Sequence, residues 1–213
     1  NTGGTITGNL SVDGGTIKLD GNYPTGSNNV ALGDTALDSV ETGAEQNVAI
    51  GGAALSADTT GNYNTGIGFR SICTNTTGSN NTAVGRQSLR NNTTASDNTA
   101  LGVNALIFNT TGGQNVAVGS NALDANTTAS NNTAVGMNSL STTTTGCENT
   151  ALGQSSLQLN LTGDNNTAVG RRALQANTSA DNNTAVGHSA LIANTTGDRH
   201  VAIGNGALSS NTV

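Results

Sequence analysis

The sequence predicts an all-β fold, a parallel β-solenoid (β-roll) of about eleven 17-residue coils. Three observations lead to this prediction. A nine-residue motif recurs at a nearly constant spacing along the chain, and short runs of Thr, Val and Ala in it end at a Gly. Bulky side chains are also scarce, since aromatic residues make up 2% of the 213 residues, with no Trp and one Pro. Such a composition suits a narrow interior rather than a wide globular core.

The repeated motif is Asn-(Thr/Val)-Ala-(Val/Leu/Ile)-Gly-x-x-(Ala/Ser)-Leu, with few exceptions. Its first residues are Asn29, Asn47, Asn64, Asn81, Asn98, Asn115, Asn132, Asn149, Asn166, Asn183 and His200. The first step is 18 residues long and every later step is 17. A constant period indicates one structural coil per unit, stacked on the next.

Within each unit, numbered from 1 at this Asn, we expect two strands and two turns. The first strand covers positions 1–4 and ends at the Gly of position 5, and the second covers positions 8–12 and ends near position 15. Position 5 is Gly in every unit, whereas position 15 is Ala at Ala95, Ala129 and Ala180. Because Gly adopts backbone angles that other residues avoid, the first turn is predicted to need Gly more strictly than the second turn.

The first strand is apolar on both of its faces. Position 3 is Ala in every unit except at Gly66, and position 4 is always Val, Leu or Ile. Neighbouring residues of a strand point to opposite faces, so one of these rows lines the interior and the other lies outside. We therefore expect another chain to cover the outer row.

Two rows of Asn are predicted to form hydrogen-bonded ladders between stacked coils. The ladder at position 1 comprises Asn64, Asn81, Asn98, Asn115, Asn132, Asn149, Asn166 and Asn183. The second, at position 12, comprises Asp58, Asn75, Asn92, Asn109, Asn126, Asn160, Asn177 and Asn194, and Thr143 interrupts it. In such a stack each side-chain amide can bond to the amides above and below it. Turn formation also explains these Asn residues, and neither role implies a ligand or cofactor.

The remaining composition narrows the possible partners. The formal net charge is −6 with no run of Lys or Arg, which argues against nucleic-acid binding. No apolar stretch approaches the roughly 18 residues of a membrane span. Residues 1–28 lack the repeat and are predicted to form an adaptor or cap, with the solenoid rod at 29–213. Cys73 and Cys147 lie a little over four coils apart, too far for a disulfide, so we expect free thiols.

No catalytic constellation is evident, and we predict a protein that is not an enzyme. His188 and His200 occupy different positions in their coils, and neither pairs with a nucleophile. Asp164, Asp181 and Asp198 share position 16 in successive coils. Asp is favoured in turns, so solvated turn residues are the main interpretation. A weak Ca²⁺ site, or a carboxylate pair like that of a glycosidase, are the alternatives.

The units Asn81-Thr82-Ala83-Val84-Gly85 and Asn47-Val48-Ala49-Ile50-Gly51 resemble the head repeats of trimeric autotransporter adhesins. The 17-residue version with Asn-Thr-Thr-Gly resembles repeats in phage tail-fibre proteins. This resemblance covers residues 29–208. It implies three chains packed side by side as a homotrimer, an extracellular location on a virion tail fibre or bacterial surface, and a host-surface receptor such as a glycan.

These features lead to one main functional hypothesis and two alternatives. The main one is a structural and adhesive segment of a trimeric surface fibre. The first alternative is an ice-binding solenoid, because position 2 is often Thr, although position 4 is apolar and Val30, Val48, Val116 and Val201 break the row. The second alternative is a carbohydrate-active tailspike enzyme.

Overall fold

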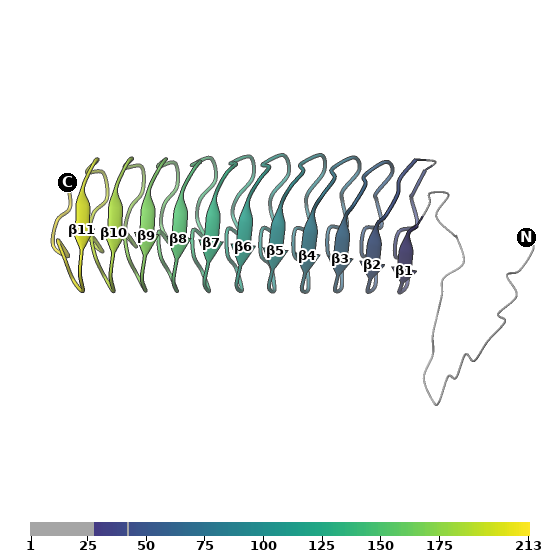
Figure 1. The fold of residues 1–213 in the computed structure, drawn as a ribbon, viewed down its shortest axis with the longest axis horizontal. Helices are drawn as coiled ribbons and strands as arrows, with labels where there is room; N and C mark the ends of the chain where they lie inside the picture. Colours follow the sequence, from purple (N-terminus) through teal and green to yellow (C-terminus); the bar gives the residue numbers. More distant parts are fainter. Residues whose placement is uncertain (1–27, 42) are drawn as a thin grey trace, which may run out of the picture.

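The computed structural model describes residues 28–41 and 43–213, and this part of the chain is a parallel β-solenoid (Figure 1). Each coil contributes one three-residue strand to a single sheet, in which the strands follow chain order. The strands are β1 (Val30–Leu32), β2 (Val48–Ile50), β3 (Thr65–Ile67), β4 (Thr82–Val84), β5 (Thr99–Leu101), β6 (Val116–Val118), β7 (Thr133–Val135), β8 (Thr150–Leu152), β9 (Thr167–Val169), β10 (Thr184–Val186) and β11 (Val201–Ile203). The fold class predicted from the repeat is therefore confirmed.

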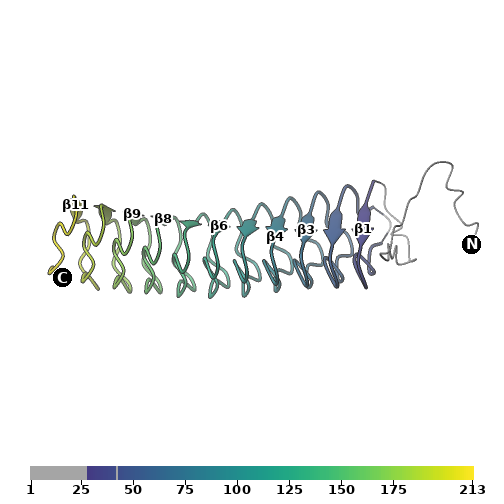
Figure 2. The ribbon, with the colours of Figure 1, turned by 90° about the horizontal axis from the view of Figure 1, so that it is seen from below.

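The coils stack in register to form an elongated rod (Figure 2). Every pair of neighbouring strands is parallel and matches residues of the same position in the unit, as in Thr133↔Thr150, Ala134↔Ala151 and Val135↔Leu152. The insertion in the first unit leaves this register intact, because Val30 pairs with Val48. The 17-residue period of the sequence is thus the period of the sheet.

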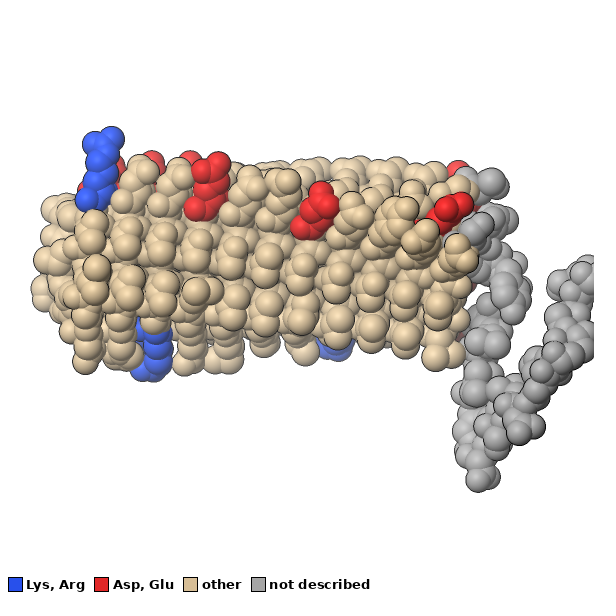
Figure 3. All heavy atoms as spheres, in the orientation of Figure 1, with Lys and Arg blue, Asp and Glu red and all other residues tan. Residues whose placement is uncertain are grey.

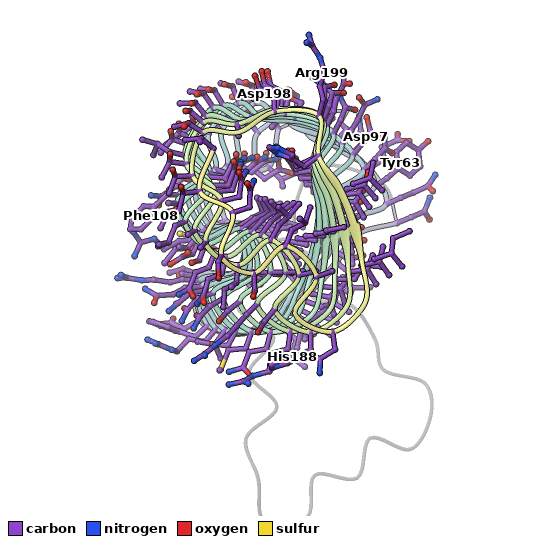
Figure 4. The ribbon with its side chains drawn as sticks, turned by 90° about the vertical axis from the view of Figure 1, so that its left-hand side faces the viewer. Tyr63, Asp97, Phe108, His188, Asp198 and Arg199 are labelled. Carbon is purple, nitrogen blue, oxygen red and sulfur yellow. The ribbon has the colours of Figure 1, made fainter. Side chains whose placement is uncertain are left out.

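Small and medium apolar side chains fill the interior of the rod. Ala at position 3 and Leu at position 9 are completely buried throughout the central coils, and the residue at position 8 is Ala or Ser. The end-on view in Figure 4 shows these inward-pointing side chains stacked along the axis. A fully buried Leu or Ile at position 9 in every coil but the last forms a continuous apolar row along the axis. The burial of each is worth about 1.5–3 kcal/mol.

Backbone hydrogen bonds connect neighbouring coils around most of their circumference, not only along the strands. In the coil that begins at Asn115, the N–H groups of Val116, Gly119, Asn121, Leu123 and Ala125 donate to carbonyl oxygens of adjacent coils at 2.8, 2.8, 3.0, 3.0 and 3.2 Å. A buried backbone group without a partner is costly, so this pattern explains how a coil with only three strand residues remains closed.

The second strand predicted at positions 8–12 does not form. These residues make turns in every coil, and the Leu or Ile at position 9 has a left-handed backbone with φ between 47° and 57°. Positions 7 and 17 are left-handed as well, for example Asn121 (φ 55°) and Asn131 (φ 61°). Left-handed residues bend the chain sharply, which lets it return to the strand within 17 residues. The Leu side chain is buried by this bend rather than by β alternation.

The glycine at position 5 adopts a conformation that other residues resist, as predicted. Its φ lies between 124° and 140° in all eleven coils, whereas position 15 glycines from Gly61 onward do not have positive φ. A Cβ atom on Gly119 would lie 2.7 Å from the carbonyl carbon and oxygen of Gly136 in the next coil. The first turn therefore needs Gly for both backbone angle and close coil contact.

Residues 1–27, in which an adaptor or cap is predicted, lie outside the described residues. So does Thr42 in the enlarged first unit. The described coils begin at the first repeat, where the sequence predicts the start of the rod.

We predict that Gly119→Ala destabilises the rod by about 2–4 kcal/mol, because it combines a forbidden backbone angle with overlap against Gly136. Chemical denaturation followed by circular dichroism measures this loss. The neighbouring variant Ser120→Ala, at a partly exposed position, is the matched control and should leave stability within about 0.5 kcal/mol of wild type. Equal stability of the two variants would contradict the assigned turn geometry.

Candidate assembly surface and interior ladders

The outward side chains of the strands form a continuous surface, which we call the outer sheet face. It consists of position 2, which is Thr or Val, and position 4, which is Val, Leu or Ile. The position 4 side chains are more than one-third exposed in four of the central strands, at 38% for Val84, 37% for Leu101, 36% for Val135 and 37% for Leu152, and Val118 between them is partly exposed. The inner neighbour at position 3 is buried, so the opposite orientation of positions 3 and 4 is confirmed.

No charged residue occurs on the outer sheet face in any of the eleven strands. Figure 3 views the rod from this side, and the charged side chains gather along its upper and lower edges. The labelled residues of Figure 4 agree, since Asp97 and Arg199 lie at one edge of the sheet and His188 lies toward the other. An apolar, uncharged stripe that runs the length of a rod is typical of a surface that another protein surface covers.

From Asn47 to Asn183 the Asn residues at position 1 are completely buried, and they bond mainly to the backbone rather than to each other. Each Oδ1 accepts the backbone N–H of position 1 in the next coil at 2.8–3.0 Å. Each Nδ2 donates to the carbonyl oxygen of position 15 in its own coil at 2.7–3.0 Å. Direct amide-to-amide bonds are longer and occur at only Asn81, Asn98, Asn115 and Asn166.

At position 12 the amides do bond to each other in the expected way. Asn92 donates one N–H to Oδ1 of Asn75 at 2.8 Å and another to the carbonyl of Ala95 at 2.9 Å. That same carbonyl also accepts a hydrogen bond from Asn81 at 2.9 Å. The position 15 carbonyl therefore joins both Asn residues of a coil, and each coil encloses a polar cluster beside its Leu.

The position 12 ladder has one gap, at Thr143. The hydroxyl of Thr143 donates to the carbonyl of Asn160 at 3.1 Å, but no group donates to Oδ1 of Asn126, which is buried without a partner. The carbonyl of Gly146 correspondingly receives one amide bond, from Asn132, instead of two. The sequence identifies this break, and the structure shows which atoms it leaves unpaired.

Asp58 occupies the N-terminal rung of the same ladder. Its side chain is completely buried, its Oδ1 accepts from Asn75 at 2.6 Å, and its Oδ2 has no partner. Burial raises the pKa of Asp58 to about 7, an increase that hydrogen bonds from Asn75 and Gly61 partly oppose. The sequence places Asp58 in the row but does not show that its carboxyl is buried.

A third ladder, at position 16, was not predicted. The side chain at this position accepts the backbone N–H of position 16 in the preceding coil, as in Ser79 N–H to Ser96 Oγ at 3.0 Å. Asp164, Asp181 and Asp198 each accept such a bond at 2.7 Å, from Cys147, Asp164 and Asp181 respectively. The signal in the sequence is that position 16 is nearly always Asn, Ser, Cys or Asp, all of which have an acceptor atom one or two bonds beyond Cβ.

The aspartates of position 16 therefore stabilise the stacking of coils. Within residues 28–41 and 43–213, no group of three or more His, Cys, Asp or Glu side chains is placed to hold a metal ion. Both cysteines of this part are free thiols, as expected from their separation.

The C-terminal coils carry a row of polar side chains at position 6. Arg171 lies between Gln154, which accepts from its Nε at 3.3 Å, and His188, whose Nε2 is 3.2 Å from its Nη1. Nδ1 of His188 is in turn 3.3 Å from Oδ1 of Asn205. Arg171 is therefore exposed and makes side-chain contacts with both of its neighbours in the row.

Comparisons with family models, curated proteins and solved structures find no match to this chain. Among the described residues no helix is long and apolar enough to cross a membrane.

We predict that Thr143→Asn stabilises the rod by about 1–2 kcal/mol. The new amide would donate to Asn126 and to the carbonyl of Gly146, which repeats the geometry of the intact rungs. The increase is measured as a higher free energy of unfolding in guanidinium. Ser141→Asn places the same side chain outside the core and serves as the control. A loss of stability in Thr143→Asn would show that the gap is not a missing rung.

Proposed function

We propose that this chain is a structural and adhesive segment of a trimeric surface fibre, a phage tail fibre or a bacterial adhesin, that spaces or presents a receptor-binding surface. The observation that carries the proposal is the outer sheet face, which has no charged residue in any of the eleven strands. It presents Val, Leu or Ile at position 4 along its whole length, beside Thr or Val at position 2. A spacer must also be stiff, and the coil-to-coil hydrogen bonds and interior ladders supply that stiffness.

Self-association is proposed from the length of this face. Soluble monomers rarely expose large contiguous apolar patches, and the position 4 row of partly exposed Val, Leu and Ile runs along the whole rod. Packing of identical chains around an axis parallel to the rod covers all the stripes at once and gives a closed assembly. The repeat pattern indicates more than one chain, and the resemblance to adhesin and tail-fibre repeats supplies the number three.

The edges of the outer sheet face are suited to such packing. Position 17 lies two residues before the first strand residue of the next unit. It is polar in most units and includes Asp97, Glu148 and Arg199. An apolar centre with a polar rim is the usual anatomy of a protein interface. A host-surface receptor, such as a glycan, then binds elsewhere on the fibre, on surfaces that remain exposed after assembly.

An ice-binding solenoid remains the second candidate because of one specific feature. Thr residues at position 2 pair in register on the outer sheet face, most regularly at Thr133, Thr150, Thr167 and Thr184. Thermal hysteresis of a purified monomer would favour this function, since the face would then contact water. A carbohydrate-active enzyme is less well supported, because the carboxylates of position 16 bond to the backbone.

The test is the mass of the protein in solution. Light scattering coupled to gel filtration should give three times the chain mass at micromolar concentration. Val135→Arg, in the middle of the outer sheet face, should shift the protein toward monomer, because three charges would meet near the axis. Thr145→Arg adds the same charge at an exposed position outside the sheet and should leave the trimer intact.

A stable wild-type monomer at micromolar concentration would overturn the fibre proposal. A trimer that tolerates Val135→Arg as well as Thr145→Arg would show that the chains associate through another face.

A further inference from the structure

Asp58 differs from every other residue of the position 12 ladder in its chemistry. From Asn75 to Asn194 the row consists of amides, apart from Thr143. Each amide donates two hydrogen bonds, except Asn160, which follows the gap at Thr143 and donates one. One goes to the Oδ1 of the rung before it and the other to the position 15 carbonyl of its own coil. A carboxylate can only accept hydrogen bonds, so Asp58 cannot reproduce this pattern when ionised.

The two oxygen atoms of Asp58 occupy the places of the two polar atoms of Asn. Oδ1 accepts from Asn75 at 2.6 Å, just as Oδ1 of Asn75 accepts from Asn92 at 2.8 Å. Oδ2 is therefore left in the place of the amide nitrogen, which in the next coil lies 2.9 Å from the carbonyl oxygen of Gly78. In the coil of Asp58 the equivalent acceptor is the carbonyl oxygen of Gly61, which receives one amide bond, from Asn47 at 2.8 Å.

We propose that Asp58 is a neutral carboxylic acid whose Oδ2–H donates to the carbonyl oxygen of Gly61, and that loss of this proton loosens the N-terminal coils of the rod. The protonated acid completes the polar cluster of its coil, as Asn does elsewhere. The ionised form would place a negative oxygen against a carbonyl oxygen inside the core, with no donor to satisfy it.

Within residues 28–41 and 43–213, no cation acts on the Asp58 carboxyl, whose pKa is set by burial and by the hydrogen bonds of Asn75 and Gly61. From the following coil the amide of Asn75, which is neutral, donates to its Oδ1 at 2.6 Å. From the preceding coil, Val40 packs against the core, while Glu41 and Glu45 are exposed acids. These acids could only disfavour a second negative charge nearby.

The direction of the pH effect follows from the raised pKa of Asp58, about 7 in the folded chain against 3.8 for the ordinary group. Between these values the folded state binds the proton and the unfolded state does not, so stability falls as pH rises. The contribution is fully present below about pH 4 and is lost by about pH 7. Coils near the end of a solenoid open most readily, so the loss should appear as local opening around Asp58.

The proposal is tested on the full chain by two measurements made as a function of pH. The first readout is the NMR signal of the Asp carboxyl carbons, labelled with ¹³C, and the signal that is lost in Asp58→Asn is assigned to Asp58. This signal should titrate with a midpoint near pH 7. Amide hydrogen exchange, corrected for its intrinsic pH dependence, should show protection in the coils beginning at Asn47 and Asn64 falling by about tenfold or more from pH 5 to pH 8. The coils beginning at Asn149 and Asn166 serve as the internal control.

Asp58→Asn should remove the pH dependence while keeping the fold, since Asn fills this place in the neighbouring coils. The converse variant Asn177→Asp should fold at pH 5 and show the same pH-dependent loosening in its own part of the rod. A carboxyl midpoint below about pH 5, or equal pH dependence in wild type and Asp58→Asn, would overturn the proposal. The number of chains in the assembly does not enter either readout, so this inference stands apart from the fibre proposal.

Discussion

The rest of the structure depends on one interaction inside each coil. The carbonyl oxygen of position 15 accepts hydrogen bonds from the Asn side chains at positions 1 and 12. A 17-residue coil encloses too little volume for a purely apolar core, and its buried side includes backbone groups that water cannot reach. Two Asn amides per coil satisfy those groups and link each coil to the next. The row of Leu at position 9 fills the remaining space.

This arrangement fixes the period and the turns. Because amides bond between equivalent positions of successive coils, an insertion inside the core would break several hydrogen bonds at once. The one extra residue, in the first unit, lies in the segment between Leu37 and Asn47 and leaves the strand register unchanged. The left-handed residues at positions 7, 9 and 17 and the Gly of position 5 bring the chain back to the amides within the allowed length. Their conformational cost is offset by the bonds that continuous stacking provides.

Much of this could be predicted from residue types at fixed spacing. The constant period predicted one coil per unit, and the alternation of Ala and Val at positions 3 and 4 predicted the inner and outer faces. The invariant Gly of position 5 predicted a turn with unusual backbone angles. The second strand was wrongly predicted because the segment between the two turn positions has the length of a short strand, although its Ala and Asn residues are uncommon in strands. Nothing in Leu123 or its neighbours signals a left-handed backbone. The position 16 ladder was missed for a different reason: Ser, Asn and Asp are equally common in solvated turns, and only the geometry shows that they accept from the preceding coil. The unpaired Oδ2 of Asp58 likewise depends on burial, which the sequence does not show.

Interior positions and the outer sheet face carry different information about function. Interior positions are nearly invariant along the chain because each must satisfy the same atoms in the next coil. The outer sheet face is also nearly invariant in character, although no intramolecular contact requires it, since Thr, Val, Leu and Ile there remain partly exposed. This restriction is the reason for proposing a contact between chains.

The most direct test of the account is the exchange of side-chain amide hydrogens, measured by NMR for each Asn. The account predicts that the Nδ2 hydrogens at positions 1 and 12, such as Asn115 and Asn92, exchange at least ~10²-fold more slowly than those of exposed Asn131 and Asn182, because exchange requires the coil to open. Equal exchange rates for the buried and exposed groups would show that the amides are solvated and that the coils are held together in some other way.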